Sequence, residues 1–595
     1  MRIRRTNLVL KEKRQSICFS NKNLLVKACP GSGKTRTITY KLAHRIEENP
    51  DKVKKLVAIT YTNRAAEEIE ERIENLGINT ERIWTGTIHQ FCIEWILKRY
   101  RMYTNSLKKG FKIIDERVTE RYITSIISYY HYNLHWKNID TGYDRNLRLK
   151  EKSTDKKRVI KTYHALLKRN TELDFEQILV TAFNLLKHNP FMANNIRDTI
   201  ELICIDEYQD TRDLQYAIVE EIANANSNSG FEVNFYGDPN QAIYGSIGGV
   251  AKSLAEINNE FSTLKFQECT LNGCYRSTQR IINYYLPYMI ENYSIIAKGS
   301  NCALKGIIDY NNKLYKDYLS DAIAEIVQST LNDGIPENEI CIIAPEWGLI
   351  YPFSRELQEK LPDISFDAPD ITPIKRDNMN IFYKISKLLL TDPSIKKIGS
   401  RCKLATEILE VLEQYSGRLV EYSILEFLNI INTFRNQSTE NIGSKFVCAG
   451  IEDLLLKMDI RIEECPELEK QFEDFKEKMN FRIENEKYRL SDDLNTFKRM
   501  FKEKKGVVIN TCHGVKGEEY ECVIAFGLLY GKVPNIHTEQ SQRDSEAKKL
   551  LYVIASRAKS RLFLFSESGR RYYDPVTHQW ENCFPARQLY ENRTT

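Results

Sequence analysis

The chain has 595 residues, 42% of them hydrophobic, which predicts roughly three to five packed domains. Its 86 Lys and Arg and 81 Asp and Glu give a net charge of +5, compatible with nucleic acid but too small to argue for it. The 14 cysteines form no C-x-x-C pair, so we expect reduced thiols and no structural metal. No apolar run reaches the roughly 20 residues of a membrane span, and no signal peptide is evident. We therefore expect a cytoplasmic protein without membrane contacts.

The first motif that carries chemistry lies at residues 24–35, LLVKACPGSGKT. An apolar run of strand type ends in a glycine turn, and Lys34, Thr35 and a helical pattern follow. Glycines in such a turn let backbone N–H groups point at an anion, and the start of the helix adds its partial positive charge. We predict a phosphate-binding loop in which Lys34 reaches the terminal phosphates and Thr35 holds Mg²⁺. Ala28 stands where the usual pattern has its first glycine, and the simpler alternative is a chance glycine-rich turn.

Two further strand patterns lead into polar turns and helices. Residues 55–60, KLVAIT, run into YTNRAAEEIEERI, and residues 83–97, IWTGTIHQFCIEWIL, carry Thr87 and His89 at the turn. Such turns fall outside the carboxyl ends of the strands, where an open α/β sheet binds its ligands. Upstream, Gln15 lies on a predicted short helix and is either an ordinary surface residue or a residue that reads adenine.

Residues 100–170 differ from the strand-rich segments around them. They are rich in Tyr, Lys and Arg and have mostly helical patterns with few apolar runs, so we predict an inserted helical subdomain. The charged run Arg148–Arg158 either follows a phosphodiester backbone or is a solvated helix face, and the sequence leaves both open. A core-type helix is predicted next, over residues 173–185.

A buried strand is predicted over residues 202–206, LICID, and it leads into two acidic residues. Such a strand is the expected partner of a phosphate loop: Asp206 would hold Mg²⁺ through water, and Glu207 would deprotonate the attacking water. The pair is weak by itself but stronger in the frame DEYQD downstream of a phosphate loop. The next strand, residues 233–236, runs into GDPNQAIYGS, with Gln241 at its end.

The second half of the chain restarts an α/β pattern. A helix is predicted near residues 316–332 and a strand over 340–344, and strand signals return at 506–510. Between them, residues 381–500 are charged and helical, which predicts a second helical insertion. Near the end, EAKKLLYVIASRAKSRLFLFS is typical of a helix, predicted to carry Arg557, followed by a strand.

The order of these motifs resembles that of superfamily-one helicases of the UvrD/Rep/PcrA type. The resemblance covers about residues 8–566 and rests on Gln15 and on nine blocks, which are ACPGSGKTR, AITYTNRAAEEI, TGTIHQF, LDFEQIL, IDEYQDTRDLQ, GDPNQAIYGS, LNGCYRST, VINTCHGVKGEEYECV and LLYVIASRAK. The DEYQD and CYRST blocks resemble this branch more than the RecD-type branch, which moves the other way along DNA.

The fold that the resemblance implies is α/β, with two RecA-like parallel-sheet cores that each carry a helical insertion subdomain. The implied domains are a first, ATP-binding core at 1–99 and 171–270, its helical insertion at 100–170, a second core at 271–380 and 501–595, and its helical insertion at 381–500.

The resemblance also implies ATP and Mg²⁺ as cofactors and gives roles to the matching residues. Gln15 is expected to read adenine and Tyr275 to stack on it, and Glu519 matches the acidic residue of the family's K-G-x-E block at the nucleotide. Thr35 and Asp206 are expected to hold Mg²⁺. The residues of the phosphate loop and its flanks are expected to bind the nucleotide: Ala28, Cys29, Pro30, Gly31, Ser32, Gly33, Lys34, Thr35 and Arg36.

The catalytic groups implied by the resemblance come from both cores. Glu207 is expected to be the catalytic base, and Gln241 is expected to sense the γ-phosphate. Arg276 and Arg557, from the second core, are expected to reach the same phosphate across the cleft as arginine fingers.

A single DNA strand is expected to run over both cores. The residues expected along it are Tyr61, Thr62, Asn63, Thr87, His89 and Tyr244 on the first core, and Thr511 and His513 on the second. After Tyr244 the family normally has aromatic-Arg-Gly, whereas this chain has Ser246-Ile247-Gly248. The aromatic that stacks on a base and the arginine are therefore both missing. Base–aromatic stacking is worth roughly 1–3 kcal/mol, so the grip on single strands is expected to be weaker or to come from elsewhere, such as Tyr244.

These observations favour an ATP-driven DNA translocase and helicase that moves 3′→5′ on single strands and unwinds tailed duplex DNA by closure of the two cores. The alternative is a DNA-stimulated ATPase that senses DNA ends and regulates a partner nuclease, as in Gabija-type antiviral systems. The short second insertion and the TIHQFC block resemble the small helicases of such systems. A degenerate nucleotide-binding scaffold is disfavoured because the catalytic set is complete: Lys34, Asp206, Glu207, Arg276 and Arg557.

Overall fold

The computed structural model describes residues 12–50, 52–104, 107–114, 116–226, 230–245, 248–367, 372–374, 377, 380–393, 398–417, 421–484, 490–501, 506–574 and 577–591. By its internal contacts the chain divides into two compact units. The first consists of Met1–Ile307, Val533–Ser560 and Arg587–Thr595, and the second of Ile308–Lys532 and Arg561–Ala586. This division differs from the domain limits predicted from the sequence, which stay a prediction.

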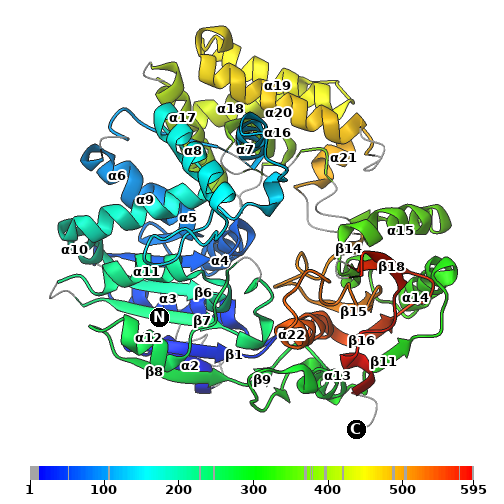
Figure 1. Cartoon of the computed structure of the whole chain (residues 1–595). Helices are drawn as coiled ribbons and strands as arrows, with labels where there is room; N and C mark the ends of the chain where they lie inside the picture. Colours follow the sequence, from blue (N-terminus) through cyan, green and yellow to red (C-terminus); the bar gives the residue numbers. More distant parts are fainter. Residues whose placement is uncertain are drawn as a thin grey trace. The chain divides into compact units, whose positions relative to one another are not determined.

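The first unit is built on a six-stranded sheet in the order β3-β2-β6-β7-β1-β8. Its strands are β3 (Ile83–Thr87), β2 (Lys55–Thr60), β6 (Ile200–Asp206), β7 (Glu232–Gly237), β1 (Asn23–Ala28) and β8 (Phe266–Leu271). Every neighbouring pair is parallel. All seven residues of β6 are buried, as expected of a strand covered on both faces. Because the strands are parallel, the loops after β1, β6 and β7 meet at one edge of the sheet (Figure 1).

Helices cover both faces of this sheet. On one face α2 (Glu12–Cys18), α3 (Lys34–Glu48) and α4 (Asn63–Asn75) bury Ile17, Leu42 and Ile69 with the strands. On the other face α9 (Phe175–His188), α10 (Pro190–Thr199) and α11 (Asp213–Ala223) form a second, larger cluster. The predicted strand and helix at residues 83–97 are present as β3, α5 (Ile88–Phe91) and a π-helical turn (Cys92–Leu97). Further helices of this unit are α12 (Leu254–Glu260), α13 (Gln279–Tyr285) and α22 (Arg543–Ala555).

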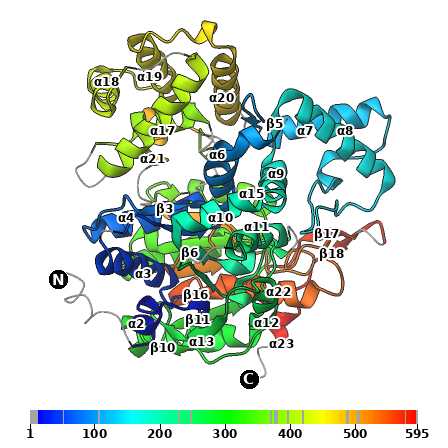
Figure 2. The same cartoon turned by 90° about the vertical axis from the view of Figure 1, so that its left-hand side faces the viewer.

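The first helical insertion has a small core of its own. The helices α7 (Glu116–Tyr129) and α8 (Thr154–Asn170) lie side by side in Figures 1 and 2. Ile123, Val159 and Tyr163 are buried between them. The short strands β4 (Lys112–Ile113) and β5 (Glu172–Leu173) pair in parallel where the insertion leaves and rejoins the core.

The second unit contains another six-stranded sheet, in the order β11-β16-β15-β12-β14-β13. Its strands are β11 (Ile307–Asn311), β16 (Ala558–Phe565), β15 (Tyr520–Ala525), β12 (Ile340–Ala344), β14 (Val507–Thr511) and β13 (Phe366–Asp367). The four strands from β15 to β13 are parallel. The helices α14 (Leu319–Asn332) and α15 (Trp347–Lys360) pack on it.

A helical array with its own hydrophobic cluster follows within the second unit. It consists of α16 (Ile381–Leu390), α17 (Ile398–Ser416), α18 (Ile424–Gln437), α19 (Gly443–Lys457), α20 (Pro466–Glu484) and α21 (Leu494–Arg499). The antiparallel pair β17 (Arg571–Asp574) and β18 (Gln579–Asn582) lies near the C-terminus. The predicted fold class, two RecA-like parallel-sheet cores with helical insertions, is confirmed. No helix in the described ranges is long and apolar enough to cross a membrane.

Candidate nucleotide and nucleic-acid site

The phosphate loop connects β1 to α3 by a tight turn. Gly31 and Gly33 have φ angles of 68° and 81°, in the left-handed region that favours glycine. A Cβ on Gly31 would also overlap the Cβ of Arg276, so the loop needs glycine there for two reasons. Ala28 is the last residue of β1 and is not among the residues with positive φ. Alanine therefore fits at the position where the usual pattern has glycine.

The loop has the chemistry of an anion site. The hydroxyl of Ser32 is buried and has no hydrogen-bond partner among the described residues. Lys34 starts α3 and its Nζ lies 2.7 Å from Oε2 of Glu207. Burial disfavours the Lys34 ammonium, but the charges of Glu207 and Asp206 outweigh it and raise the pKa of Lys34. A buried hydroxyl, a cation and the N-terminus of a 15-residue helix fit the phosphates of a nucleotide.

The two acidic residues stand where β6 ends. Asp206 is the last residue of the strand, and its Oδ1 accepts a hydrogen bond of 2.9 Å from the backbone N–H of Glu207. Burial and the charge of Glu207 raise the pKa of Asp206 to about 7. Glu207 has a φ of 54°, which is a strained conformation for this residue type. This left-handed conformation turns the chain sharply after Asp206.

These carboxylates, with the Thr35 hydroxyl, are the hard oxygen donors that Mg²⁺ prefers, and Mg²⁺ is usually bound by one or two carboxylates plus substrate phosphates. Across the described parts of the chain, no group of three or more His, Cys, Asp and Glu residues is placed to hold a metal by itself. The donor set fits a nucleotide-bound Mg²⁺, which Thr35 and Asp206 would hold; their role stays a prediction.

A buried relay of amide and carboxylate groups links the catalytic residues. Gln209 is fully buried, and its Nε2 donates to Oε2 of Glu207 at 2.5 Å. Its Oε1 accepts from the backbone N–H of Asp238 at 3.0 Å. The Asp238 carboxylate in turn accepts from Nε2 of Gln241 at 2.8 Å. The base and the expected γ-phosphate sensor are therefore connected through two side chains that the sequence analysis did not single out.

Asp238 is the centre of a second set of contacts. Besides Gln241, the hydroxyls of Tyr293 and Tyr552 donate to it at 2.9 and 3.2 Å. Burial raises the pKa of Asp238 in spite of these hydrogen bonds. Tyr552 lies on α22, so this carboxylate fixes that helix to the loop after β7.

Arg557 continues the relay. Its Nη2 donates to Oε1 of Gln241 at 2.8 Å and to the hydroxyl of Ser556 at 3.0 Å. The Ser556 carbonyl accepts from Nη1 of Arg276 at 2.6 Å. Arg557 is only 1% exposed, so its guanidinium is directed into the protein and not into solvent. Gln241, Arg557 and Arg276 thus meet within the compact unit that holds the phosphate loop.

The prediction that the final helix carries Arg557 is wrong by two residues. The helix α22 ends at Ala555, and Arg557 follows in the turn before β16. Nε of Arg557 donates to the carbonyl of Val553 at 3.0 Å. The guanidinium therefore binds a carbonyl of the last helical turn from outside the helix.

One arginine contacts the expected adenine site. Gln15 lies on α2, as predicted, and Tyr275 follows β9 (Gly273–Cys274). The guanidinium carbon of Arg14 lies 4.0 Å from the centroid of the Tyr275 ring, and Arg14 also donates to the Ser32 carbonyl. Arg36 lies over its neighbour Tyr40. Arg14 therefore joins the expected base-stacking residue to the phosphate loop.

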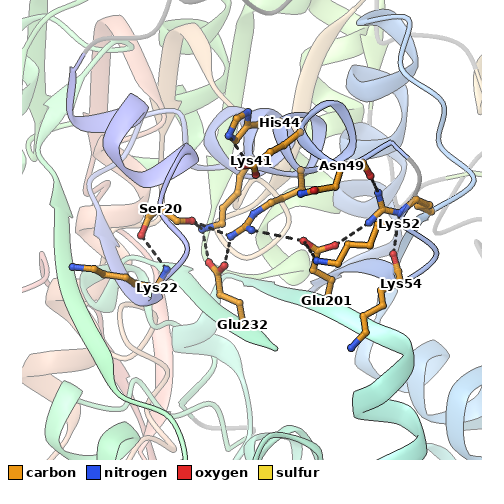
Figure 3. Close-up of polar contacts among 12 residues, drawn as sticks. Ser20, Lys22, Lys41, His44, Asn49, Lys52, Lys54, Glu201 and Glu232 are labelled. Carbon is orange, nitrogen blue, oxygen red and sulfur yellow. Dashed lines mark hydrogen bonds and ion pairs between the residues drawn. The ribbon is translucent and has the colours of Figure 1, made fainter. Parts of the chain in front are cut away.

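A buried ionic network holds α2 and α3 in place (Figure 3). Nζ of Lys41 lies 2.5 Å from Oε1 of Glu232 and donates to the carbonyl of Ser20 at 3.0 Å. Arg45 donates to the same carbonyl at 3.1 Å and pairs with Glu232. Lys41 is fully buried, and the Glu232 carboxylate offsets the cost of burying its ammonium. The network fixes the chain after Gln15 against the helix that begins at Lys34.

An aromatic pair lies at the same edge of the sheet. The rings of Tyr61 and Tyr244 are stacked, with centroids 4.8 Å apart and an interplanar angle of 26°, and Tyr61 is 37% exposed. Burial raises the pKa of Tyr61 to about 12, so the Tyr61 ring is neutral at physiological pH. An exposed aromatic stack can bind the faces of unpaired bases without regard to sequence.

The other residues expected along the strand have structural roles as well. The Thr62 hydroxyl caps α4 by accepting from the Ala65 N–H at 3.2 Å. The Thr87 hydroxyl caps α5 within a capping box completed by Gln90. The Asn63 Oδ1 is buried without a partner among the described residues. These caps explain why the polar residues stand at the starts of helices.

His89 is a neutral side chain in this site. Its ring packs edge-on against Phe175, with centroids 5.3 Å apart. Burial and the nearby charge of Arg212 lower the pKa of His89 to about 4. At neutral pH it can therefore exchange hydrogen bonds but adds no positive charge.

Three predicted site residues belong to the second unit. Thr511 ends β14, and its hydroxyl accepts from the Gly514 N–H at 3.1 Å. His513 follows in this turn, where its Nδ1 lies 3.5 Å from the Cys512 sulfur. Glu519 is exposed in the loop before β15. Their roles stay predictions.

Sequence reasoning missed Arg14, Gln209 and Asp238. Gln209 and Asp238 stand inside the blocks IDEYQDTRDLQ and GDPNQAIYGS. Their spacing of two residues from Glu207 and three from Gln241 was a usable signal. Arg14 gave no signal beyond its position next to Gln15. The substitutions Ser246 and Ile247, noted in the sequence, lie outside the described residues.

Replacing Gln209 by alanine is expected to lower kcat by about 10- to 100-fold with little change in ATP affinity. The change removes one of the hydrogen bonds to Oε2 of Glu207, which Lys34 still contacts, and leaves the Asp238 N–H without the Gln209 acceptor. Losing such buried hydrogen bonds costs about 1–3 kcal/mol. ATP titration and steady-state hydrolysis would separate binding from turnover. Asn224→Ala, which removes an amide that donates to the Glu260 carbonyl, is a matched control. A kcat within twofold of wild type would show that Gln209 does not position the base.

Comparison with known proteins shows which families this chain is similar to and over which residues. Residues 9–262 match the family described as UvrD/REP helicase N-terminal domain. The ATP-dependent DNA helicase PcrA of Staphylococcus epidermidis is 23% identical over 639 aligned residues, covering 94% of this chain and 83% of the relative. PcrA of Staphylococcus aureus is 23% identical over 634 residues with the same coverage. These matches confirm that the chain resembles the UvrD/PcrA-type superfamily-one helicases over most of its length.

Proposed function

We propose that this chain is an ATP-dependent DNA helicase that translocates 3′→5′ on single-stranded DNA and unwinds tailed duplex. The observation that carries the proposal is the hydrogen-bonded relay through one compact unit. It links the following residues in order: Lys34, Glu207, Gln209, Asp238, Gln241, Arg557, Ser556 and Arg276. A degenerate scaffold would have no reason to keep this set of charges buried and paired.

The residues have complementary tasks in hydrolysis. Mg²⁺ at Thr35 and Asp206 would neutralise charge on the phosphates. Lys34 pairs with Glu207, and phosphate oxygens compete for the same ammonium. Substrate binding would therefore release the Glu207 carboxylate to accept a proton from the attacking water. The guanidinium groups of Arg276 and Arg557 donate hydrogen bonds in planar forks, which suits the charge that develops on a transferred phosphoryl group.

The position of the stacked pair Tyr61 and Tyr244 supports movement along single-stranded DNA. The stacked pair Tyr61 and Tyr244 stands at the carboxyl edge of the sheet that carries the nucleotide residues. Tyr244 follows Gln241 by three residues, so a change at the γ-phosphate can reach the aromatic pair through one short turn. The proposed direction rests on the resemblance of the DEYQD and CYRST blocks.

The proposal is tested by measuring ATP hydrolysis with single-stranded, duplex and tailed DNA, together with strand displacement. We expect single strands to stimulate hydrolysis and duplexes with 3′ tails to be unwound. A scrambled strand of equal length should stimulate equally, because contacts to phosphates and base faces carry no sequence information. Unwinding only of duplexes with 5′ tails would contradict the proposed 3′→5′ direction. A rate of ATP hydrolysis that DNA does not change would contradict the proposed helicase function.

Changing Glu207 to glutamine is expected to leave ATP and Mg²⁺ binding intact and to remove most turnover, by about 10²- to 10⁴-fold. The amide keeps the shape of the side chain but cannot accept a proton from water. The check is nucleotide binding beside single-turnover hydrolysis. Loss of ATP affinity instead of turnover would make Glu207 a metal-binding or structural residue.

The second candidate is a DNA-stimulated ATPase that senses ends and regulates a partner nuclease in antiviral defence. It is favoured by Ser246-Ile247-Gly248 standing in place of aromatic-Arg-Gly, which is expected to weaken the grip needed for unwinding. Robust DNA-stimulated hydrolysis without strand displacement, together with hydrolysis-dependent control of a co-purifying nuclease, would select this candidate.

A further inference from the structure

The turn that carries Tyr244 lacks the arginine expected beside it. The Gly249 N–H donates to the Tyr244 carbonyl at 3.1 Å, and the Val250 N–H donates to the Thr211 carbonyl at 3.0 Å. Gly248 has a φ of 93° within this turn. The turn is therefore held against the chain segment after β6, and the residue after Gly248 is hydrogen-bonded to Tyr244, one of the two stacked aromatic residues.

Two cations from elsewhere in the chain lie at this turn. A Cβ built on Gly248 would be 3.1 Å from Nζ of Lys150 and 3.5 Å from Nε of Arg212. Arg212 begins the segment that leads into α11, whereas Lys150 belongs to the helical insertion. The insertion thus places a lysine beside the motif in which this chain has lost its own cation.

Of the two cations, only Lys150 keeps its charge available. Arg212 is half-buried and forms a two-pronged ion pair with Glu176, whose Oε2 lies 3.1 Å from Nη2. Lys150 is exposed, and no carboxylate in the described ranges forms an ion pair with it. An external anion would therefore meet the ammonium of Lys150 rather than the guanidinium of Arg212.

The loop that carries Lys150 is fastened to the core. Arg145 pairs with Glu220 on α11 and with Glu260 at the end of α12. The Lys150 N–H donates to the Gly142 carbonyl at 3.0 Å. Such anchoring reduces the entropy that Lys150 would lose on binding a ligand.

The charge of the chain is concentrated in this insertion. Residues 100–170 contain 17 Lys and Arg against 7 Asp and Glu, a net charge of +10, whereas the whole chain has +5. The remainder therefore has 69 basic and 74 acidic residues, a net charge of −5. A positive charge of this density attracts a polyanion. The sequence alone had left open whether these charges contact a phosphodiester backbone or only form a solvated helix face.

We propose that Lys150 binds a phosphate of the single strand beside Tyr61 and Tyr244, replacing the cation missing from the Ser246–Gly248 segment. This inference rests on the proposed function, because it takes the strand to lie over the aromatic pair. It makes the loop 140–150 part of the motor's strand-binding surface and assigns the partner as the phosphodiester backbone of unpaired DNA.

The test compares Lys150→Ala, Lys150→Arg and Lys161→Ala with wild type in binding a fluorescent oligo(dT) across a salt series. Lys161 is an exposed lysine on α8 and serves as the control for a general loss of charge. Each phosphate contact to a single strand contributes about 0.7 to the slope of log K against log salt. We expect Lys150→Ala to reduce the slope by about 0.7. Raising the salt from 50 to 200 mM should therefore weaken DNA binding by wild type about threefold more than DNA binding by Lys150→Ala. Lys150→Arg should keep the wild-type slope.

Hydrolysis without DNA distinguishes failure of this inference from failure of the proposed function. Lys150→Ala should hydrolyse ATP without DNA at the wild-type rate and need more oligo(dT) for half-maximal stimulation. Equal slopes for Lys150→Ala and wild type, or an equal reduction in Lys161→Ala, would overturn the inference alone. Failure of wild type to bind oligo(dT) at all would overturn the proposed function with it.

Discussion

Replacing Lys34 by alanine is expected to abolish ATP hydrolysis and to weaken nucleotide binding by at least tenfold. Lys34 is the one cation within the loop stretch from Cys29 to Thr35. The carboxylates around it outweigh its burial and raise its pKa, so Lys34 is charged at neutral pH. A phosphate bound without that point charge would face Glu207 and Asp206 with one positive charge fewer beside it.

The measurement is nucleotide binding and hydrolysis in Lys34→Ala beside a double variant that also carries Glu207→Gln. The single change removes the counter-ion of the half-buried Glu207 carboxylate, which costs stability apart from any role in catalysis. The double change removes both charges and should recover stability but not activity. Near-normal hydrolysis in Lys34→Ala would remove the phosphate loop from the mechanism.

The strands next to the motifs were predictable from sequence because each is a short apolar run that ends directly before the polar residues of a motif. The strand over residues 340–344 and the strand over 55–60 have the predicted bounds, since each is a short buried run closed by polar residues. The phosphate loop was predictable because its turn needs glycines at positions with positive φ, and that need depends only on neighbouring residues in the sequence.

Contacts between distant segments were not predictable from the residues alone. The hydrogen bond from Arg557 to Gln241 joins residues 316 positions apart, and nothing in either segment specifies the other. The same holds for Lys150 and Gly248, which meet only because the insertion folds back on its core. The end of α22 was missed because the side chain of Arg557 itself stabilises the terminus, which periodicity cannot show.

Arg557→Ala is expected to retain ATP binding and to lose about 10³- to 10⁵-fold in turnover with saturating single-stranded DNA. The guanidinium is 1% exposed and donates to Gln241, to Ser556 and to the Val553 carbonyl. Removing it takes away a fixed charge at the expected γ-phosphate and one hydrogen bond to the Gln241 oxygen. Lysine should rescue only in part, because one ammonium cannot make these divergent contacts.

Arg561→Ala is the matched control for Arg557→Ala. Arg561 lies four residues further along, on β16, and its ion pair with Asp333 stands on the exposed side. An exposed pair of this kind contributes about 0–1 kcal/mol, so its loss should leave turnover within a few-fold of wild type. Single-turnover hydrolysis separates chemistry from product release in both variants. If Arg557→Ala hydrolyses ATP as fast as Arg561→Ala, the relay from Glu207 to Arg557 supports the fold of the site without stabilising the transition state.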